Sequence, residues 1–354
     1  MAGEVIMRNS KRVTIKQVAR EAGVSTQTVS RVINDRPDVA PETRQRVQQV
    51  ISDLSYRPSA LARSLIHQRS FTLGVVTAGL KYIGPNRTLN GITEEAEELG
   101  YSLLLKELPR FDAKDIQPIL DALLARQVDG IIWAVPEVGG NMRWLQVGQL
   151  SIPVPMIFLT IEARTDFSIV SVDNYLGGRI ATGHLLEQGY RRIGHITGPI
   201  DWWEVQQRKS GWQDALTDAG LNSSEEHWVE GNWSSASGER AFCELIENYP
   251  EIDAVFVAND QMALGVLLCA YRRGLEVPQD LGIVGFDSIP EGAFFWPPLT
   301  TVHQDLNKLG CTAVQELVEN IESDWNGNRN VDSKNILIQP QIVIRESSTG
   351  PRTY

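Results

Sequence analysis

The feature that most constrains this chain is the stretch from residue 14 to residue 34, which reads TIKQVAREAGVSTQTVSRVIN. Its first half has apolar residues at i, i+3, i+4 and i+7, a spacing that predicts a helix with one apolar side: Ile15, Val18, Ala19 and Ala22. Thr14 and Gln17 can form a capping box at the start of this helix, and Gly23 is expected to end it.

A second helix is expected to begin at Ser25, which can cap it, and its apolar residues fall on one side: Val29, Val32 and Ile33. At about 100° per residue, the polar residues of the opposite side point away from the core: Gln27, Arg31 and Asn34. Two short helices joined at a glycine, the second with a polar outer face, predict a helix-turn-helix. An ordinary amphipathic helix pair would show the same pattern, so only the types of the exposed residues can indicate whether the pair binds DNA.

The polar residues of the second helix favour DNA as the partner. Gln is suited to a bidentate contact with adenine and Arg to one with guanine, so we expect Thr26, Gln27 and Arg31 to read base pairs. Hydroxyl groups near the helix ends are placed to contact phosphates. The candidate DNA-binding residues of this region are Thr14, Ser25, Thr26, Gln27, Thr28, Arg31, Asn34 and Tyr56.

Charge is distributed unevenly along the 354 residues. Residues 1–70 carry 12 Lys and Arg against 6 Asp and Glu, whereas the remainder carries 21 against 38, so that the net charge of −11 divides into +6 and −17. A basic head on an acidic body suits a module that contacts phosphates attached to one that does not. The acidic body can equally serve only to keep the protein in solution.

A third helix is expected after the second, with Pro41 and Glu42 in its first turn and one apolar stripe: Val47, Val50, Ile51 and Leu54. The three helices are enough for a small domain, which should end where Pro58 pushes the preceding residue out of the α region. The following segment, residues 59–67, reads SALARSLIH. It has helical propensity, but at nine residues it should fold only when something supports it.

From residue 71 onward, short apolar runs alternate with helical patterns, which predicts parallel, doubly wound sheets. The strands are expected near residues 71–77, 102–108, 130–135, 155–160, 192–197, 229–233, 254–259 and 282–287. The helices are expected near residues 86–99, 113–126, 141–150, 174–188, 204–219, 235–248 and 260–274. The body is thus predicted to consist of two α/β halves.

Ligands of open α/β sheets bind at the carboxyl ends of the strands. The residues at these ends are Trp133, Trp202, Glu204, Trp233, Asn259, Asp260 and Asp287. Indole rings that cover the C–H face of a sugar, beside acids and amides that read its hydroxyls, predict a carbohydrate site. Two alternatives stay open, because Trp133 and Trp203 could belong to the core, and Asn259 and Asp260 could only cap the next helix.

Residues 13–65 contain, in order, VTIKQVAREAGVS, TVSRVIN, PETRQRV, LSYRP and SALARSL, and they resemble the lactose-repressor/galactose-repressor family of bacterial transcription regulators. The similarity continues to about Glu346. It implies that residues 58–70 form a hinge helix and linker that order on operator DNA. Leu65 would be wedged into the minor groove and Ala62 would allow a close approach to it. Ala40 departs from the family, which often has a capping Ser before the third helix.

The resemblance also implies a body with the two lobes of a periplasmic sugar-binding protein, connected by three crossings near residues 171–174, 300–305 and 327–334. Arg208 and Asp287 match the positions that bracket the effector, and Trp233 matches the aromatic that stacks on it. The further residues that we expect to contact the effector are Tyr82, Pro85, Trp133, Trp202, Glu204, Asn259 and Gln304. Leu176 stands where a lactose-binding member carries a sugar-contacting acid, so a galactoside is not the expected ligand.

The domain boundaries expected from this resemblance are a DNA-binding domain at 1–57, the hinge at 58–70, a body at 71–347 and a tail at 348–354. One lobe would comprise about 71–172 and 304–330, and the other about 173–303 and 331–347. No heptad repeat follows Arg345, so we expect a homodimer without the tetramerising tail of some members.

The sequence gives no sign of export, of a membrane segment or of catalysis. The cysteines are far apart, the histidines lack metal-site spacing, and no dinucleotide, P-loop or hydrolase signature occurs. His195 lies inside a predicted strand and is expected to be a core residue. We therefore expect a cytoplasmic, dimeric repressor without metal or cofactor, whose affinity for operator DNA is set by a small ligand, with a mono- or disaccharide expected. The rivals are a sugar-binding receptor of a transport system and a sugar-processing enzyme.

Overall fold

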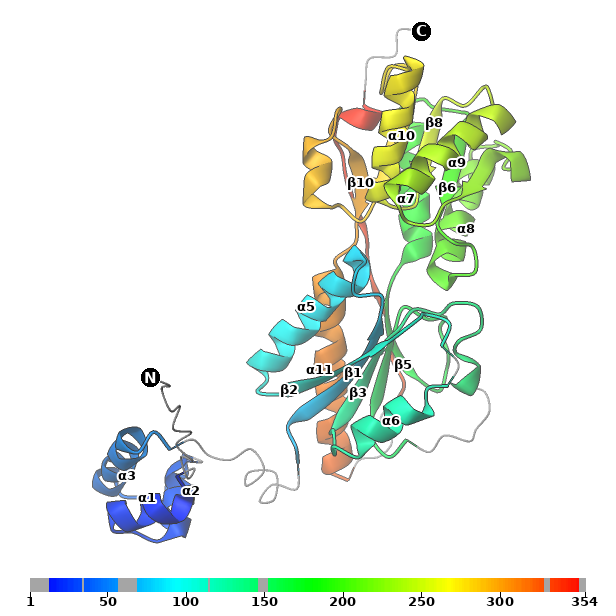
Figure 1. Cartoon of the computed structure of the whole chain (residues 1–354). Helices are drawn as coiled ribbons and strands as arrows, with labels where there is room; N and C mark the ends of the chain where they lie inside the picture. Colours follow the sequence, from blue (N-terminus) through cyan, green and yellow to red (C-terminus); the bar gives the residue numbers. More distant parts are fainter. Residues whose placement is uncertain are drawn as a thin grey trace, which may run out of the picture. The chain divides into compact units, whose positions relative to one another are not determined.

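The computed structural model describes residues 13–33, 35–56, 69–113, 115–145, 152–327 and 332–349. The chain divides into two compact units, residues 1–70 and residues 71–354, which we call the head and the body (Figure 1).

The described part of the head consists of three helices, α1 (Ile15–Ala22), α2 (Thr26–Ile33) and α3 (Pro41–Asp53). The predicted signals at the ends of the helices are confirmed. The backbone N–H of Thr14 donates to Gln17 Oε1 at 2.8 Å, Gly23 ends α1 at φ 66°, and the N–H of Thr28 donates to Ser25 Oγ at 3.1 Å. Each bond satisfies a backbone group that a helix terminus leaves without a partner.

The three helices enclose the predicted apolar core, whose buried residues are Val18, Ala19, Ala22, Val29, Val32 and Val47. Val50, Ile51 and Leu54 of the α3 stripe pack against this core and are only partly buried. Ala40, at the cap of α3, makes no side-chain bond to the helix. Residues 58–68 of the predicted hinge, which include Ala62 and Leu65, lie outside the described residues, and so does Asn34.

The body contains two sheets of six strands each, as predicted for a two-lobed fold. The first lobe has the strand order β11-β5-β4-β3-β1-β2, with β1 (Thr72–Ala78), β2 (Ser102–Leu108), β3 (Gly130–Ala134), β4 (Met156–Leu159), β5 (Ser168–Val172) and β11 (Asn335–Ile338). The second lobe has the order β12-β10-β9-β8-β6-β7, with β6 (Ile193–Thr197), β7 (Trp228–Glu230), β8 (Ala254–Val257), β9 (Gly282–Phe286), β10 (Thr300–His303) and β12 (Gln341–Val343). All neighbouring strands are parallel except β10 and β12.

Helices cover both faces of each sheet, which explains why most of the strands are apolar throughout (Figure 1). In the first lobe, α5 (Ile83–Glu98) and α11 (Leu306–Trp325) pack on one face and α6 (Gln117–Leu124) on the other. In the second lobe, one face is covered by α9 (Ser235–Asn248) and α10 (Asp260–Arg273), and the other by α7 (Asn174–Glu187) and α8 (Trp203–Asp218). Among the described helices, none combines the length and the apolar character needed to span a bilayer.

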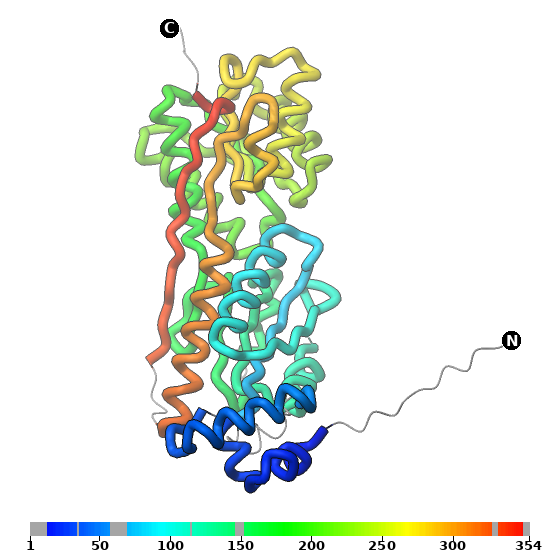
Figure 2. The backbone as a smooth tube through the Cα atoms, turned by 90° about the vertical axis from the view of Figure 1, so that its left-hand side faces the viewer, coloured from blue at the N-terminus to red at the C-terminus, as the bar shows by residue number. Residues whose placement is uncertain are grey.

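Three segments connect the lobes, and two of the predicted crossings are confirmed, between β5 and α7 and between β10 and α11. The prediction of the third crossing near 327–334 was wrong. Asn335 pairs with Ile169 in the first-lobe sheet, so that the chain passes to the second lobe only between β11 and β12. In Figure 2 this red segment runs beside the orange one that contains β10 and α11. Of the predicted helix at 141–150, the described part contains a short 3-10 turn, Arg143–Leu145.

Glycines allow the helices of each pair to touch through their backbones. A Cβ atom built on Gly178 of α7 would lie 2.2 Å from the carbonyl oxygen of Arg208 in α8, and one on Gly211 would lie 2.1 Å from the carbonyl oxygen of Tyr175. Similar contacts occur at Gly91 and Gly310 between α5 and α11 and at Gly238 and Gly265 between α9 and α10. Any side chain at these positions would push the paired helices apart.

We expect Gly178→Ala to lower the free energy of unfolding by about 2 kcal/mol or more, because its methyl group would overlap backbone atoms that cannot move independently. Gly183, on the same helix, has no atom within 4 Å of an added Cβ, so Gly183→Ala should raise stability by up to about 1 kcal/mol. Urea unfolding of the two variants checks both values. Equal effects would show that the helix contact does not constrain the fold.

Candidate functional site

The outer face of α2 presents the side chains predicted to read DNA. Thr26, Gln27 and Arg31 are exposed, whereas Val29 and Val32 on the opposite side are buried. Arg31 Nη1 lies 3.3 Å from Asp38 Oδ2, but both side chains are more than half exposed, at 54% and 56%. An ion pair this exposed contributes little to stability, so the guanidinium can exchange it for a base or a phosphate.

The other residues predicted to bind DNA in the head take different positions. Thr14 and Ser25 are exposed and cap their helices, and the hydroxyls of Ser25 and Thr28 are 3.0 Å apart. Tyr56 is half-buried and packs against the core of the head, so only part of its side chain is accessible. These positions are compatible with phosphate contacts, and the assignment stays a prediction.

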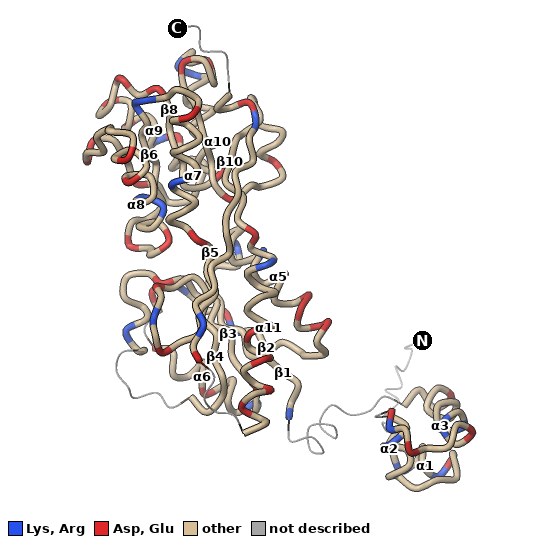
Figure 3. Tube along the Cα trace, turned by 180° about the vertical axis from the view of Figure 1, so that it is seen from behind, with Lys and Arg blue, Asp and Glu red and all other residues tan. Residues whose placement is uncertain are grey.

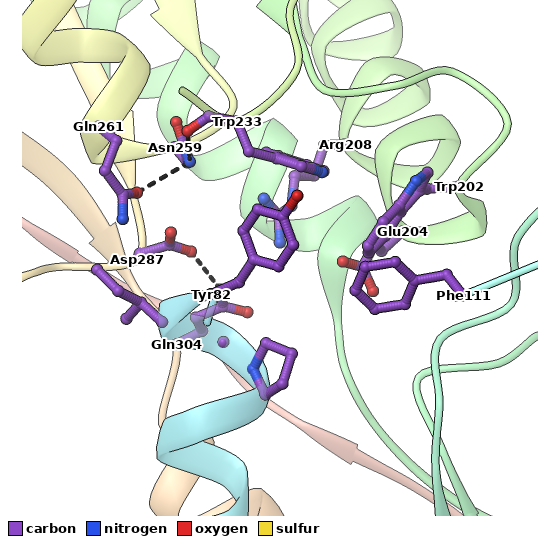
Figure 4. A pocket seen from close by; sticks show the side chains of 13 residues that line it. Tyr82, Phe111, Trp202, Glu204, Arg208, Trp233, Asn259, Gln261, Asp287 and Gln304 are labelled. Atoms are coloured by element: carbon purple, nitrogen blue, oxygen red, sulfur yellow. Dashed lines mark hydrogen bonds between the residues drawn. The ribbon is translucent and has the colours of Figure 1, made fainter. Parts of the chain in front are cut away.

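In the body, a pocket of about 510 Å³ lies between the two lobes. The first lobe contributes the start of α5 and Phe111, and the second contributes the carboxyl ends of its strands (Figure 4). The lining residues are Tyr82, Ile83, Gly84, Pro85, Phe111, Trp202, Glu204, Arg208, Trp233, Asn259, Gln261, Asp287 and Gln304. The structure thus brings nine of the ten residues predicted to bind an effector into one pocket; Trp133 is the exception.

The prediction for Trp133 was wrong, because the side chain faces the core. It is 1% exposed, and its ring lies 5.0 Å from that of Trp144 in the cluster beneath α6. Successive side chains of a strand point to opposite faces of the sheet, so a position near the carboxyl end does not by itself reach the cleft. Ala134, the next residue, lines the cleft instead.

Arg208 is the most constrained residue of the pocket. It is 3% exposed, its Nε donates to Asn174 Oδ1 at 2.8 Å, and its Nη1 donates to the carbonyl oxygen of Ala258 at 2.6 Å. The guanidinium carbon lies 3.8 Å from the ring centroid of Phe286 and 5.9 Å from that of Trp233. Burial lowers the pKa of Arg208, while Asp287 and Glu204 oppose that effect. The side chain is therefore fixed before any ligand arrives.

Two carboxyl groups lie near this cation, the buried Asp287 and the partly buried Glu204. Asp287 accepts a hydrogen bond from Gln304 Nε2, and burial raises the pKa of Asp287 to about 6 although Arg208 opposes the shift. Burial likewise raises the pKa of Glu204 to about 7. Both groups face the pocket, where a ligand hydroxyl can donate to them.

Capping the next helix and binding a ligand were the two roles open for Asn259 and Asp260, and the structure is compatible with both for Asn259, whereas Asp260 makes other contacts. Asn259 caps α10, because its Oδ1 accepts from the N–H of Met262 at 2.8 Å, and it also lines the pocket. Asp260 is fully buried behind the pocket, where it accepts from Thr301 Oγ1 at 2.6 Å and from the N–H of Ile289 at 2.8 Å. Burial raises the pKa of Asp260 to about 7.

Four aromatic rings form one continuous wall of the pocket, with centroid distances of 5.9 Å from Tyr82 to Phe111, 4.6 Å from Phe111 to Trp202 and 5.6 Å from Trp202 to Trp233. Trp233 has φ 72°, a conformation rare for a large residue, and its carbonyl accepts from Asn259 Nδ2 at 3.1 Å. The wall crosses from one lobe to the other. Sequence reasoning missed Phe111, which follows β2, and Gln261; the rule that ligands bind at strand ends could have found Phe111.

Trp202 is held at the mouth of the cleft by backbone bonds between the lobes. The N–H of Gly139 donates to the carbonyl of Asp201 at 3.2 Å, and the N–H of Trp203 donates to the carbonyl of Glu137 at 3.1 Å. These bonds close one side of the pocket.

His195, predicted to be a core residue, is fully buried and stacks on Phe256, and burial lowers its pKa to about 3.

The pocket can therefore bind a hydroxylated ring through stacking on indoles and hydrogen bonds to fixed carboxyl, amide and guanidinium groups. Within the described ranges, no group of three His, Cys, Asp or Glu residues could hold a metal ion. Acidic and basic residues are interspersed over both lobes of the body (Figure 3).

Comparison with known proteins connects both sites to one family. Residues 14–59 match the description "Bacterial regulatory proteins, lacI family", and residues 182–348 match a periplasmic binding protein-like domain. The ribose operon repressor of Escherichia coli (strain K12) is 34% identical over 309 residues, which are 87% of this chain and 93% of the repressor.

Comparison with solved structures points to the same family. A lac repressor dimer bound to operator and the anti-inducer ONPF superposes with a TM-score of 0.83 at 30% identity, over 96% of this chain and all of the repressor. A complex of the transcriptional regulator CelR with cellobiose superposes with a TM-score of 0.69 at 29% identity, over 95% of this chain and all of CelR. The resemblance and fold expected from the sequence are confirmed. The chain therefore belongs to the lacI family of bacterial regulatory proteins and is a DNA-binding transcriptional regulator with a periplasmic-binding-protein-like body.

Proposed function

We propose that this protein is a homodimeric repressor that reads a pseudo-palindromic operator through α2 and is released from it when a saccharide binds between the lobes of the body. The observation that carries this proposal is the pocket in which Arg208 and Asp287 lie beside the indole of Trp233. A relative with a similar fold is described with cellobiose, and another relative is named for the ribose operon.

The domain boundaries follow from this proposal. We assign operator contacts to residues 1–57, conditional ordering on DNA to residues 58–70, and effector binding and dimerisation to residues 71–347. Leu65 is assigned as the minor-groove wedge and Ala62 as the small residue beside it, by resemblance alone. Because its operator lies on bacterial DNA, we place the protein in the cytoplasm.

The second lobe carries apolar side chains that suit a dimer interface. Tyr271, Phe294 and Trp296 are 79%, 88% and 90% exposed, and Leu264 and Leu268 on α10 are also exposed. Leu264, Leu268 and Tyr271 are spaced along one side of α10, and contiguous apolar patches of this kind mark interaction surfaces in proteins. We propose that a second copy of the chain covers them, because two heads are needed to read two half-sites.

The effector acts by preferring one arrangement of the lobes. A ligand shifts such an equilibrium only by the difference between its affinities for the two states, which in allosteric systems is about 1–3 kcal/mol. A saccharide that contacts Tyr82 and Pro85 in the first lobe and Asp287 in the second prefers the closed cleft. The movement would change the spacing between the hinge segments of the two subunits.

A thermal-shift screen of the full chain against mono- and disaccharides tests the proposed effector class. A ligand at about 100 times its Kd should add about 2.7 kcal/mol of stability. Asp287→Asn keeps the shape of the side chain but removes its charge, and we expect it to weaken the identified saccharide by about tenfold or more. Asp121→Asn, an exposed change on α6, should leave the affinity unchanged. If no saccharide stabilises the protein, the proposed effector class is wrong.

Arg31→Ala tests the DNA-reading face. We expect at least a tenfold loss of affinity for an operator selected from random DNA by the unchanged protein, since one bidentate base contact discriminates by about 1–3 kcal/mol. Effector binding should stay intact, because Arg31 belongs to the head and the pocket to the body. Arg20→Ala is the control on α1, with the side chain 74% exposed. Similar operator affinities for both variants would contradict the assignment of α2.

Glu204 should give the ligand-free protein a pH-dependent stability. Its pKa is raised from 4.5 to about 7 by burial, so the folded protein holds the proton more tightly than the unfolded chain. This contribution to stability is present below about pH 4.5 and is lost as the pH rises through about 7. Glu204→Gln should therefore increase the free energy of unfolding by about 1–3 kcal/mol more at pH 8 than at pH 5.

Urea unfolding at the two pH values measures this difference. Glu162→Gln, which neutralises an exposed carboxylate, serves as the control and should show no such dependence on pH. A Glu204→Gln effect that is the same at pH 5 and pH 8 would mean that burial does not perturb this carboxyl group.

A further inference from the structure

A second cavity adjoins the pocket on the side of the first lobe. It has a volume of about 580 Å³ and shares six lining residues with the first cavity: Gly84, Pro85, Trp202, Glu204, Arg208 and Gln304. The other nine residues that line the second cavity are absent from the lining of the first, so the cleft extends beyond the first cavity and a ligand can reach from one into the other.

The two cavities differ in chemistry. The first has the wall of four rings and the amides of Asn259 and Gln261. Apart from Trp202, the second lacks these groups and is lined by aliphatic side chains at the ends of β3, β4 and β5 and at the start of α11, together with three polar side chains: Ala134, Leu159, Val172, Leu306, Leu309, Thr88, Thr160 and Asn174. A ligand that fills both cavities needs a ring that stacks on aromatic side chains at one end and a group that packs against aliphatic side chains at the other.

Glu204 stands where the two cavities meet, because it lines both. Among the described residues, its carboxyl group has no hydrogen-bond or ion-pair partner, unlike Asp287, which accepts from Gln304. A carboxyl group in a cleft needs a hydrogen-bond donor to offset the loss of water. A ligand hydroxyl at the junction supplies one.

Charge excludes one class of sugar. The charged residues that line the two cavities are Glu204, Asp287 and Arg208, so acids outnumber bases. Arg208 already donates to Asn174 and to the carbonyl of Ala258, which leaves it poorly placed to neutralise a phosphate as well. Sugar phosphates would meet two acids in a site of low polarity.

We infer that the effector is an uncharged glycoside with two parts. Its glycosyl ring lies in the aromatic cavity, against the wall that includes Trp202 and Trp233, and its aglycone, either a second sugar or a non-sugar group, lies in the aliphatic cavity of the first lobe. Glu204 accepts hydrogen bonds from hydroxyls beside the glycosidic bond. This inference rests on the proposed saccharide effector and specifies its charge and length.

Isothermal titration of the full chain tests it with matched probes. In both the gluco and the galacto series, the probes are the free hexose, the methyl and phenyl glycosides, a disaccharide and the hexose 6-phosphate. In at least one series, we expect a phenyl glycoside or a disaccharide to bind about tenfold or more tightly than the free hexose. The hexose 6-phosphate should bind more weakly than the free hexose. Comparison of the phenyl glycosides with the disaccharides tells which kind of aglycone fits.

Ala134→Leu narrows the aliphatic cavity without changing the aromatic one. It should remove most of the gain from the aglycone, about tenfold, and leave the free hexose affinity within about twofold. Ala125→Leu, an exposed change of the same size in the first lobe, should affect neither ligand. At about pH 8, where Glu204 with its pKa of about 7 is ionised, Glu204→Gln should narrow the difference between the free hexose and its 6-phosphate, because it removes one of the two negative charges.

The outcomes separate this inference from the proposed function. If free hexoses bind as tightly as every glycoside tested, or if Ala134→Leu weakens both equally, the two-part ligand is wrong while a saccharide effector stands. If a hexose phosphate binds most tightly, the charge argument is wrong. If no saccharide of either series binds, the proposed effector class itself fails.

Discussion

The buried guanidinium of Arg208 is the interaction on which the cleft depends. A buried cation costs several kcal/mol unless hydrogen bonds and opposite charges compensate for the lost water, at roughly the scale known for buried ion pairs. Its partners are Asn174 at the start of α7, the carbonyl of Ala258 after β8, and the ring of Phe286 at the end of β9. One side chain thus joins three elements at the edge of the sheet. The contact of Gly178 with the Arg208 backbone brings α8 close enough to α7 for these bonds to form.

The elements of this fold with strong local signals were predictable from the sequence. The predicted helix 235–248 and strand 102–108 have the same bounds in the structure, because Ser234 caps the helix at its start and Gly100 turns the chain before the strand. The strands β5 and β10 were predicted only as crossings, and β11 was placed in the wrong lobe. These strands have four or five residues and pair with segments distant in sequence, such as β11 with β5. No local pattern encodes such pairing.

Two kinds of reasoning predicted the residues of the pocket: the position of strand ends and the resemblance to a known family. Reasoning from strand ends pointed to Trp202, Glu204, Trp233, Asn259 and Asp287, and these residues line one pocket because the carboxyl ends of parallel strands meet at one edge of a sheet. The resemblance to a known family supplied the first-lobe side, which local patterns did not mark. Trp133 was wrongly predicted to line the pocket, because its place near the end of β3 does not show which face of the sheet its side chain reaches. Successive side chains of β3 alternate between the two faces, and that of Trp133 points into the core.

The turn that carries Asp287 connects ligand binding to the lobe arrangement. Asp287 and Ser288 have φ values of 108° and 52°, which cost non-glycine residues about 1–3 kcal/mol each unless the surroundings fix them. Ser288 N–H donates to Thr301 Oγ1 at 3.2 Å, and Arg87 of the first lobe donates to the carbonyl oxygen of Asp287 at 3.1 Å. The second bond spans the two lobes, so it changes when they move. A ligand that binds the Asp287 carboxyl group therefore acts on a residue whose backbone already contacts the opposite lobe, and it needs no further relay to favour one arrangement.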